Sequence, residues 1–80
     1  MTVRVLLFAS YADALGASAI DVELPAGARV ADVRERVSAL AAGKRVPAKP
    51  MVAVNQRYAR DDQAITAADE VAIIPPVAGG

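Results

Sequence analysis

Hydrophobic residues in the first third of the chain recur with strand-like spacing. Residues 3–8 are apolar at both odd and even positions, a pattern typical of a strand that is covered on both faces. Residues 20–24 alternate between apolar and acidic side chains, which predicts a strand with one face in water. Between them, residues 10–16 are interpreted as a connector that is compatible with one helical turn closed by Gly16.

The middle of the chain has helical spacing instead. Its valine and leucine positions lie three or four residues apart, at Val30, Val33, Val37 and Leu40. Charged residues separate them, so the pattern predicts one amphipathic helix over residues 30–42, with Gly43 as its C-cap. Arg29 stands at the expected N-cap, where its side chain offers no acceptor, and we expect this to cost about 1 kcal/mol.

The second half of the chain adds three apolar stretches. Residues 51–54 predict a short strand, and after a turn at 55–57 residues 58–59 predict a weak return strand. Residues 69–74 begin acidic and become apolar, which predicts the last strand. The elements therefore follow one another as strand, strand, helix, strand, short strand and strand.

This element order predicts a single α+β domain over residues 1–80. A single helix crossing a mixed sheet of four or five strands is the arrangement called the β-grasp. In that fold the first and last strands are parallel central neighbours, joined through the whole domain. Because 19 of the 80 residues are alanine, we expect a small core and modest stability.

The last strand runs into two prolines and a diglycine carboxylate. Pro75 and Pro76 cannot donate to a sheet ladder and fix their own φ, so the chain is expected to leave the sheet in a stiff, extended path. Gly79 and Gly80 carry no side chains, so the end can enter a narrow channel and its carboxylate is open to activation. We therefore predict that residues 75–80 form a projecting, flexible Gly-Gly tail that carries the function. The alternative is an ordinary frayed terminus.

Charge and hydropathy argue against several classes of partner. Nine basic and nine acidic residues give a formal net charge of zero, so there is no electrostatic footprint for nucleic acid or for an anionic membrane. The first apolar run is too short for a signal peptide, and no stretch approaches the length of a membrane span. We expect a cytoplasmic protein.

The absence of cysteine and histidine narrows the chemistry. It excludes thiolate nucleophiles, disulfides, iron–sulfur ligation and the usual zinc sites, and it removes the commonest general base. The remaining carboxylates, lysines, serines and tyrosines show no recognisable catalytic spacing. We therefore expect no metal site, no bound cofactor and no catalysis by this chain alone.

Two stretches are similar to one known family. Residues 51–56, MVAVNQ, and residues 69–80, DEVAIIPPVAGG, resemble the small subunit of molybdopterin synthase, a ubiquitin-like sulfur carrier. The first strand and the helix also fall where that family has them, so the resemblance covers nearly the whole chain. Its specific part is PPVAGG after an acidic-then-apolar strand, because the Val-Asn strand end is shared with related sulfur carriers.

The resemblance implies a mechanism centred on Gly80. A ubiquitin-activating-type adenylyltransferase would adenylate its carboxylate with ATP, and sulfur from a persulfide donor protein would convert it into a thiocarboxylate. The large synthase subunit would then take the tail into its active site, in an assembly of two large and two small subunits. There the sulfur would pass to a cyclic pterin phosphate to build the dithiolene of molybdopterin.

The strand pattern suggests where the large subunit would bind. Leu6 and Phe8 share one face of the first strand, Ala72 and Ile74 share one face of the last, and a single helix can cover one face only. We expect Phe8 and Ile74 to contact the large subunit; the alternative is that they are core residues under loops. The contact would extend along the tail through Pro75, Pro76, Val77, Ala78 and Gly79.

Two other functional classes remain open at this stage. The first is a carrier of the same fold for thiamine synthesis or tRNA thiolation, or a ubiquitin-like modifier that is conjugated to other proteins. The second is a plain interaction module whose diglycine end is incidental.

Overall fold

The computed structural model describes residues 1–47 and 49–75 of the 80-residue chain, and Ala48 and residues 76–80 lie outside these ranges. Within them the chain forms five strands and two helices. In chain order they are β1 (Thr2–Leu7), α1 (Ala9–Leu15), β2 (Ala19–Glu23), α2 (Val30–Leu40), β3 (Met51–Val54), β4 (Arg57–Tyr58) and β5 (Val71–Ile74). The strands and the long helix come in the predicted order, with α1 in addition.

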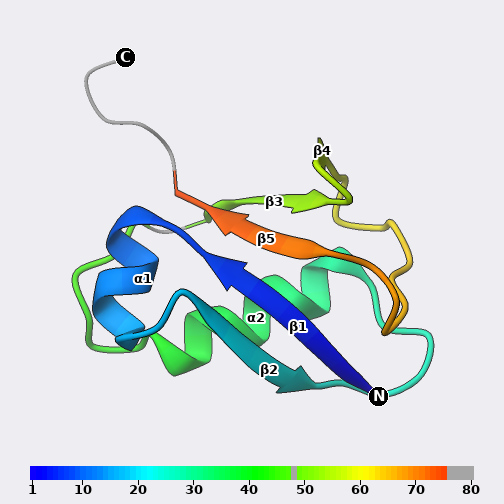
Figure 1. The fold of residues 1–80 in the computed structure, drawn as a ribbon, viewed down its shortest axis with the longest axis horizontal. Helices are drawn as coiled ribbons and strands as arrows, with labels where there is room; N and C mark the ends of the chain where they lie inside the picture. Colours follow the sequence, from blue (N-terminus) through cyan, green and yellow to red (C-terminus); the bar gives the residue numbers. More distant parts are fainter. Residues whose placement is uncertain (48, 76–80) are drawn as a thin grey trace.

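The five strands form one mixed sheet in the order β2-β1-β5-β3-β4. β1 and β5 run parallel, with Val5 opposite Val71, and the other neighbouring strands are antiparallel. Figure 1 shows α2 crossing one face of this sheet and α1 at the end where β1 finishes. The predicted β-grasp, with the first and last strands as parallel central neighbours, is confirmed.

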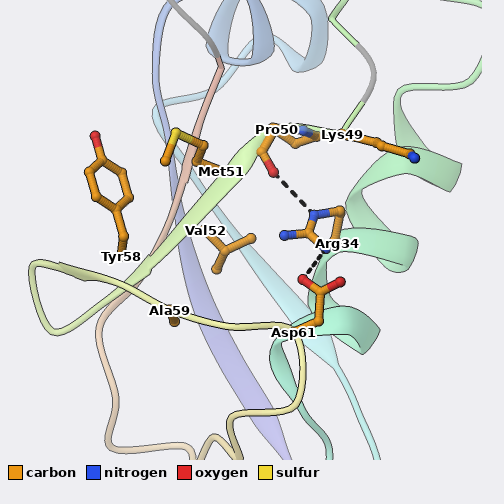
Figure 2. A pocket seen from close by; sticks show the side chains of 8 residues that line it. All are labelled: Arg34, Lys49, Pro50, Met51, Val52, Tyr58, Ala59 and Asp61. Carbon is orange, nitrogen blue, oxygen red and sulfur yellow. Dashed lines mark hydrogen bonds and ion pairs between the residues drawn. The ribbon is translucent and has the colours of Figure 1, made fainter.

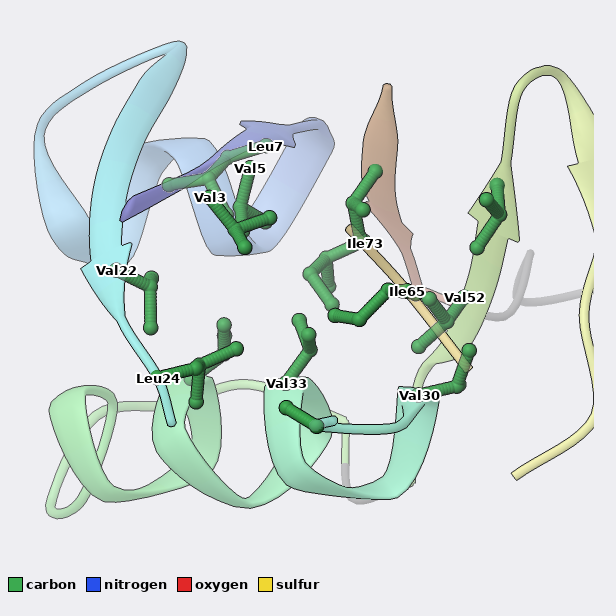
Figure 3. Packing of buried hydrophobic residues seen from close by; sticks show 14 of the residues in the cluster. Val3, Val5, Leu7, Val22, Leu24, Val30, Val33, Val52, Ile65 and Ile73 are labelled. Atoms are coloured by element: carbon green, nitrogen blue, oxygen red, sulfur yellow. The ribbon is translucent and has the colours of Figure 1, made fainter. Parts of the chain in front are cut away.

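The core lies between α2 and the face of the sheet that α2 crosses, which we call the covered face (Figure 3). Val30, Val33 and Val37 are fully buried there, because their spacing places them on one side of the helix. Alternate strand residues meet them from the sheet: Val3, Val5, Leu7, Val22, Val52, Val54, Val71 and Ile73. Valine suits this thin layer, because its short β-branched side chain has few rotamers to lose on burial.

α1 is a complete helix where the sequence predicted a connector with one turn. It spans Ala9–Leu15 and ends at Gly16, whose φ of 68° is the left-handed conformation of a glycine C-cap. Tyr11 anchors it, since this side chain is 1% exposed and its hydroxyl donates to the carbonyl oxygen of Pro47. Burial raises the pKa of the Tyr11 hydroxyl. The contact spans 36 residues, and therefore leaves no trace in the local sequence pattern.

α2 begins where the sequence predicts, but its first turn is stabilised by a distant loop. The backbone N–H groups of Val30 and Ala31 donate to carbonyl oxygens in the 61–63 loop, at 3.0 Å each. The Asp32 carboxylate accepts the backbone N–H of Arg29 at 2.8 Å. The predicted cost of about 1 kcal/mol for a missing side-chain cap therefore does not apply, because tertiary partners satisfy these groups.

Two predicted boundaries at turns were wrong by one or two residues. α2 ends at Leu40, and Gly43, with a φ of 80°, belongs to the turn that follows. The turn between β3 and β4 has two residues, Asn55 and Gln56, with φ of 53° and 68°. Two left-handed residues make the tight hairpin turn whose twist matches that of the strands. Arg57 consequently belongs to β4 and not to the turn.

Candidate functional site

The face of the sheet opposite α2, which we call the open face, carries the side chains that alternate with the core positions. The prediction that both faces of the first strand are covered was wrong. Val5 and Leu7 are buried under α2, whereas Leu6 is half-buried and Phe8, directly after β1, is 48% exposed. Phe8 is therefore no core residue of this domain.

The apolar side chains of the open face gather around the end of β5. Cross-strand partners share a face of the sheet, and Ala72 lies between Leu6 of β1 and Ala53 of β3. Ala53 in turn pairs with Tyr58 of β4. We call this cluster the apolar half of the open face; its members are Leu6, Phe8, Met51, Ala53, Tyr58, Ala72 and Ile74.

Two alanines make the middle of the apolar half lower than its rim. Ala53 and Ala72 are 6% and 8% exposed and form the floor of a hollow of about 440 Å³. Phe8 and Tyr58 line the hollow and are 48% and 65% exposed. With Met51, they are three of the four exposed large hydrophobic residues in the described part of the chain. Exposed apolar side chains gathered on one face are typical of a protein-binding surface.

The other end of the open face is charged. Arg4 of β1 pairs with Asp21 of β2, and Thr2 pairs with Glu23, whose carboxylate accepts the Thr2 hydroxyl. Glu70 precedes β5 and borders the hollow from this side. The open face thus changes from charged to apolar along β1 and β5, toward the point where the chain leaves β5.

The backbone after Phe8 is strained. Ala9 has a φ of 49°, in the left-handed region that disfavours any residue with a Cβ atom, at a cost on the order of 1 kcal/mol. This sharp turn leads from β1 into α1 and leaves Phe8 with extended backbone as the N-cap of α1. The Phe8 side chain consequently stays at the rim of the hollow.

The tail begins beside the apolar half. Ile74 is half-buried and borders the hollow, and Pro75, the last residue that the structure describes, is buried. The predicted contacts of Pro76, Val77, Ala78 and Gly79 and the predicted reacting carboxylate of Gly80 lie outside the described residues. Of the predicted site residues, the structure brings together Phe8 and Ile74, with Pro75 next along the chain.

Met51 and Tyr58 belong to this surface, and the sequence reasoning missed them. The sequence pattern placed Met51 in a short strand and Tyr58 in a weak return strand, but it did not show which face of the sheet their side chains occupy. A two-residue turn at 55–56 would have revealed the register, because it pairs residue 53 with residue 58. A turn of three residues shifts this register and hides the pairing.

A cluster of side-chain hydrogen bonds lies just before the start of β5, at the end opposite to Pro75. The Asp69 carboxylate accepts the backbone N–H of Thr66 at 2.8 Å and the side-chain amide of Asn55 at 3.0 Å. These hydrogen bonds, above all the one from Thr66, lower the pKa of Asp69. The Asn55 side-chain oxygen accepts the Glu70 N–H at 2.9 Å. The cluster closes the turn before β5, and its polar groups bond to one another, so we assign it a structural role.

Metal ligands do not cluster in the part of the chain that the structure describes. Among residues 1–47 and 49–75, no three His, Cys, Asp or Glu side chains are placed to hold a metal ion. Within the same ranges, no helix combines the length and the apolar character that crossing a bilayer requires.

Comparison with known proteins agrees with the β-grasp fold. The model of the ThiS family matches residues 5–80, and the chain belongs to this family. It is 37% identical to the molybdopterin synthase sulfur carrier subunit of Chlamydomonas reinhardtii over 83 aligned positions, which cover all of both chains.

Two solved structures show the same ubiquitin-like β-grasp fold. One is a putative molybdopterin converting factor, subunit 1, from Pyrococcus furiosus, with a TM-score of 0.79, 30% identity, and coverage of 96% of this chain and 99% of that one. The other is SAMP1 of Haloferax volcanii, with a TM-score of 0.81, 28% identity and complete coverage of both chains.

Proposed function

We propose that this chain is the sulfur-carrier subunit of a molybdopterin synthase. The observation that carries the proposal is the point at which the chain leaves the sheet, which is Pro75, beside the apolar half of the open face. A partner that binds this surface is in place to receive the diglycine end. The end-to-end similarity to the sulfur carrier subunit of Chlamydomonas reinhardtii supports the same function.

The reacting group in this proposal is the carboxylate of Gly80. A carboxylate is a poor acyl donor, so an adenylyltransferase first joins it to AMP, with ATP as the donor and pyrophosphate as the leaving group. Sulfur from a persulfide donor, with a thiol as reductant, then displaces AMP and leaves a thiocarboxylate. Because the chain contains no cysteine, the open terminal carbonyl is its evident site for holding sulfur.

The large subunit supplies the active site in this scheme, and the carrier supplies sulfur and a docking surface. Phe8 and Ile74, with Met51 and Tyr58 beside them, would be buried by the large subunit. The tail would then enter its active site and transfer sulfur to a cyclic pterin phosphate, building the dithiolene of molybdopterin. Two carriers and two large subunits would form the working assembly in the cytoplasm. The carrier itself would bind no cofactor.

The alternative is a carrier or modifier of the same fold with another acceptor. The likeness to SAMP1 of Haloferax volcanii over the whole length of both chains, and to a structure described as the small archaeal modifier protein 1 of the same organism, favours a modifier role of this kind. In that case the activated Gly80 would be joined to an amine of a target protein, or its sulfur would serve thiamine synthesis or tRNA thiolation.

Mass spectrometry of the terminus tests the proposal. The chain is incubated with the activating enzyme, ATP and a persulfide donor. We expect its C-terminal peptide to become heavier by the difference between one sulfur and one oxygen. Addition of the large subunit and the pterin precursor should return that mass to its original value and produce molybdopterin. A mass gain on an internal peptide would contradict the carrier function. A stable conjugate to other proteins, without molybdopterin, would favour the modifier.

A further inference from the structure

The last strand residue before the tail depends on β3 for its place in the sheet. The pairing of β1 with β5 reaches Ile73, so in the described ladder the one strand partner of Ile74 is Met51, the first residue of β3. The Asn55 N–H donates to the Glu70 carbonyl at 2.7 Å. Along an antiparallel ladder, hydrogen-bonded pairs alternate with pairs that are not hydrogen-bonded. Met51–Ile74 lies four positions from Asn55–Glu70, so it is a hydrogen-bonded pair as well. The start of β3 therefore sets the point from which the tail leaves the sheet.

The start of β3 has little support from strands on its outer side. β4 contains only two residues. Directly after β4, the Ala59 N–H donates to the Val52 carbonyl oxygen at 2.9 Å, which adds one more hydrogen bond to β3. Every second residue of a strand points its backbone polar groups toward the same neighbouring strand. After Val52, the next residue that would bond on this side is therefore Pro50. Pro50 has no N–H to donate, and its ring is fully buried.

Arg34 supplies a hydrogen bond to the start of β3 where no strand residue does so. Its Nε donates to the carbonyl oxygen of Pro50 at 3.1 Å, and its Nη1 forms an ion pair with the Asp61 carboxylate. Figure 2 shows the guanidinium between these two partners, with Tyr58 on the far side of β3. The Arg34 side chain is 22% exposed and its hydrogen bond to Pro50 is partly buried, whereas the Asp61 side chain is 65% exposed. The planar guanidinium directs two separate nitrogens, Nε and Nη1, at the two partners, whereas lysine carries all of its donors on one nitrogen.

We propose that Arg34 is a positioning residue for the tail. By holding Pro50, it fixes the start of β3, and through the Met51–Ile74 rung it fixes the direction in which the chain leaves at Pro75. Pro75 fixes its own φ, so the position of Ile74 sets the point and the direction from which the rest of the chain starts. Transfer requires reacting atoms about 3 to 3.5 Å apart, and a misplacement of about 1 Å costs on the order of a hundredfold in rate. The inference rests on the proposed function, since it concerns the same tail.

Arg34→Gln tests this role, with Arg36→Gln as the matched control. Both changes remove one positive charge from α2, and Arg36 is exposed. We expect Arg34→Gln to slow single-turnover sulfur transfer from the thiocarboxylated carrier by about tenfold or more at saturating large subunit. The Kd for the large subunit should stay within about threefold, because Arg34 lies outside the apolar half. Arg36→Gln should change neither quantity.

Amide hydrogen exchange gives a readout that a general loss of stability would not imitate. In Arg34→Gln, exchange at Ile74 should accelerate, while exchange at Val71, which β1 and β3 both flank, should stay as in the wild type. Asp61→Asn keeps the contact with Pro50, so its transfer rate should remain within about threefold of the wild type.

Several outcomes would overturn the inference. One is wild-type transfer and wild-type exchange at Ile74 in Arg34→Gln, and another is an equal rate loss in Arg36→Gln. If Arg34→Gln does not fold, Arg34→Lys takes its place, and it should show a smaller loss of the same kind because lysine keeps the positive charge but has donors on one nitrogen instead of two. A wild-type chain that accepts no sulfur would refute the proposed function, while the exchange rates would still decide whether Arg34 holds Ile74.

Discussion

The two faces of the sheet are built from the same strands in opposite ways. Ile73 is fully buried against α2, whereas its neighbour Ile74 points to the open face and is half-buried. The covered face fills its centre with valine, leucine and isoleucine side chains. The open face has alanine at its centre, at positions 53 and 72, and places large side chains around the rim, among them Phe8 at 48% exposed.

This difference separates folding from recognition. A small domain has little apolar surface to bury, and its net stability of about 5 to 15 kcal/mol comes largely from that burial. Leaving Phe8, Met51 and Tyr58 outside the core gives up stability that the domain could otherwise have. A surface of this kind is expected where a partner completes the burial. Substitutions on the covered face should therefore lower the free energy of unfolding. Substitutions on the open face or in the tail should instead change the affinity for the partner or the rate of sulfur transfer.

Deletion of Gly80 should show the separation most sharply. The residue lies beyond Pro75, so its loss should leave the Tm essentially unchanged. The carboxylate moves back by up to about 3.5 Å, and thiocarboxylate formation and sulfur transfer should both disappear. Thermal unfolding and mass spectrometry of the terminus measure the two effects. Gly79→Val should behave similarly, because its β-branched side chain widens the tail. A deletion variant that still forms thiocarboxylate at the normal rate would refute the role of the tail.

Phe8→Asp should weaken binding of the large subunit by about 30-fold or more, since the change places a charge in an apolar contact. The fold should survive, because residue 8 is the N-cap of α1 and aspartate is a favourable N-cap. Calorimetric titration against the large subunit measures the affinity, and circular dichroism measures the fold. Ser10→Asp adds the same charge in the first turn of α1 and serves as the control. An unfolded Phe8→Asp protein would assign Phe8 to folding and not to recognition.

Ile73→Val and Ile74→Val compare the two faces by one identical change at adjacent positions. Removing a methylene group under α2 should lower the free energy of unfolding by about 0.5 to 1.5 kcal/mol. The same change on the open face should stay within about 0.5 kcal/mol. Urea denaturation at 25 °C measures both. Equal losses at the two positions would show that the open face contributes to folding as the covered face does.

The parts of the fold that local patterns encode were predictable. The helical spacing of Val30, Val33 and Val37 gave α2, and the strand patterns gave the order of the elements along the chain. The sheet order, with β1 and β5 at its centre, followed from the β-grasp fold that this element order indicates. Within the candidate site, alternation placed Phe8 on one face of the first strand with Leu6, and Ile74 on one face of the last strand with Ala72. The elements and these faces depend on residues that are close together in the sequence, whereas the sheet order depends on knowledge of the fold.

The parts that depend on distant contacts were not predictable. α1 is anchored by Tyr11 to Pro47, and the first turn of α2 is completed by the 61–63 loop. The role of Arg34 at Pro50 needs the packing of α2 beside β3. Met51 and Tyr58 were missed for a smaller reason: a one-residue error in the length of a turn changes which strand residues face each other.

The smallest expected effect concerns the polar cluster before β5, which lies far from the tail. Hydrogen bonds from Thr66 and Asn55 hold the pKa of Asp69 below its usual value of 3.8. A carboxyl group with a lowered folded-state pKa contributes stability that is present above the unfolded-state pKa and is lost as the pH falls through the folded-state value.

Asp69→Asn should therefore have a lower Tm than the wild type at pH 7, and this difference should shrink as the pH is lowered below 3.8. Thermal unfolding between pH 7 and pH 2.5 measures the difference. Sulfur transfer at pH 7 should be unchanged, because Asp69 precedes β5 whereas the chain leaves the sheet at Pro75, after the other end of β5. A Tm difference that stays constant over the whole pH range would mean that the Asp69 charge has no part in holding this turn.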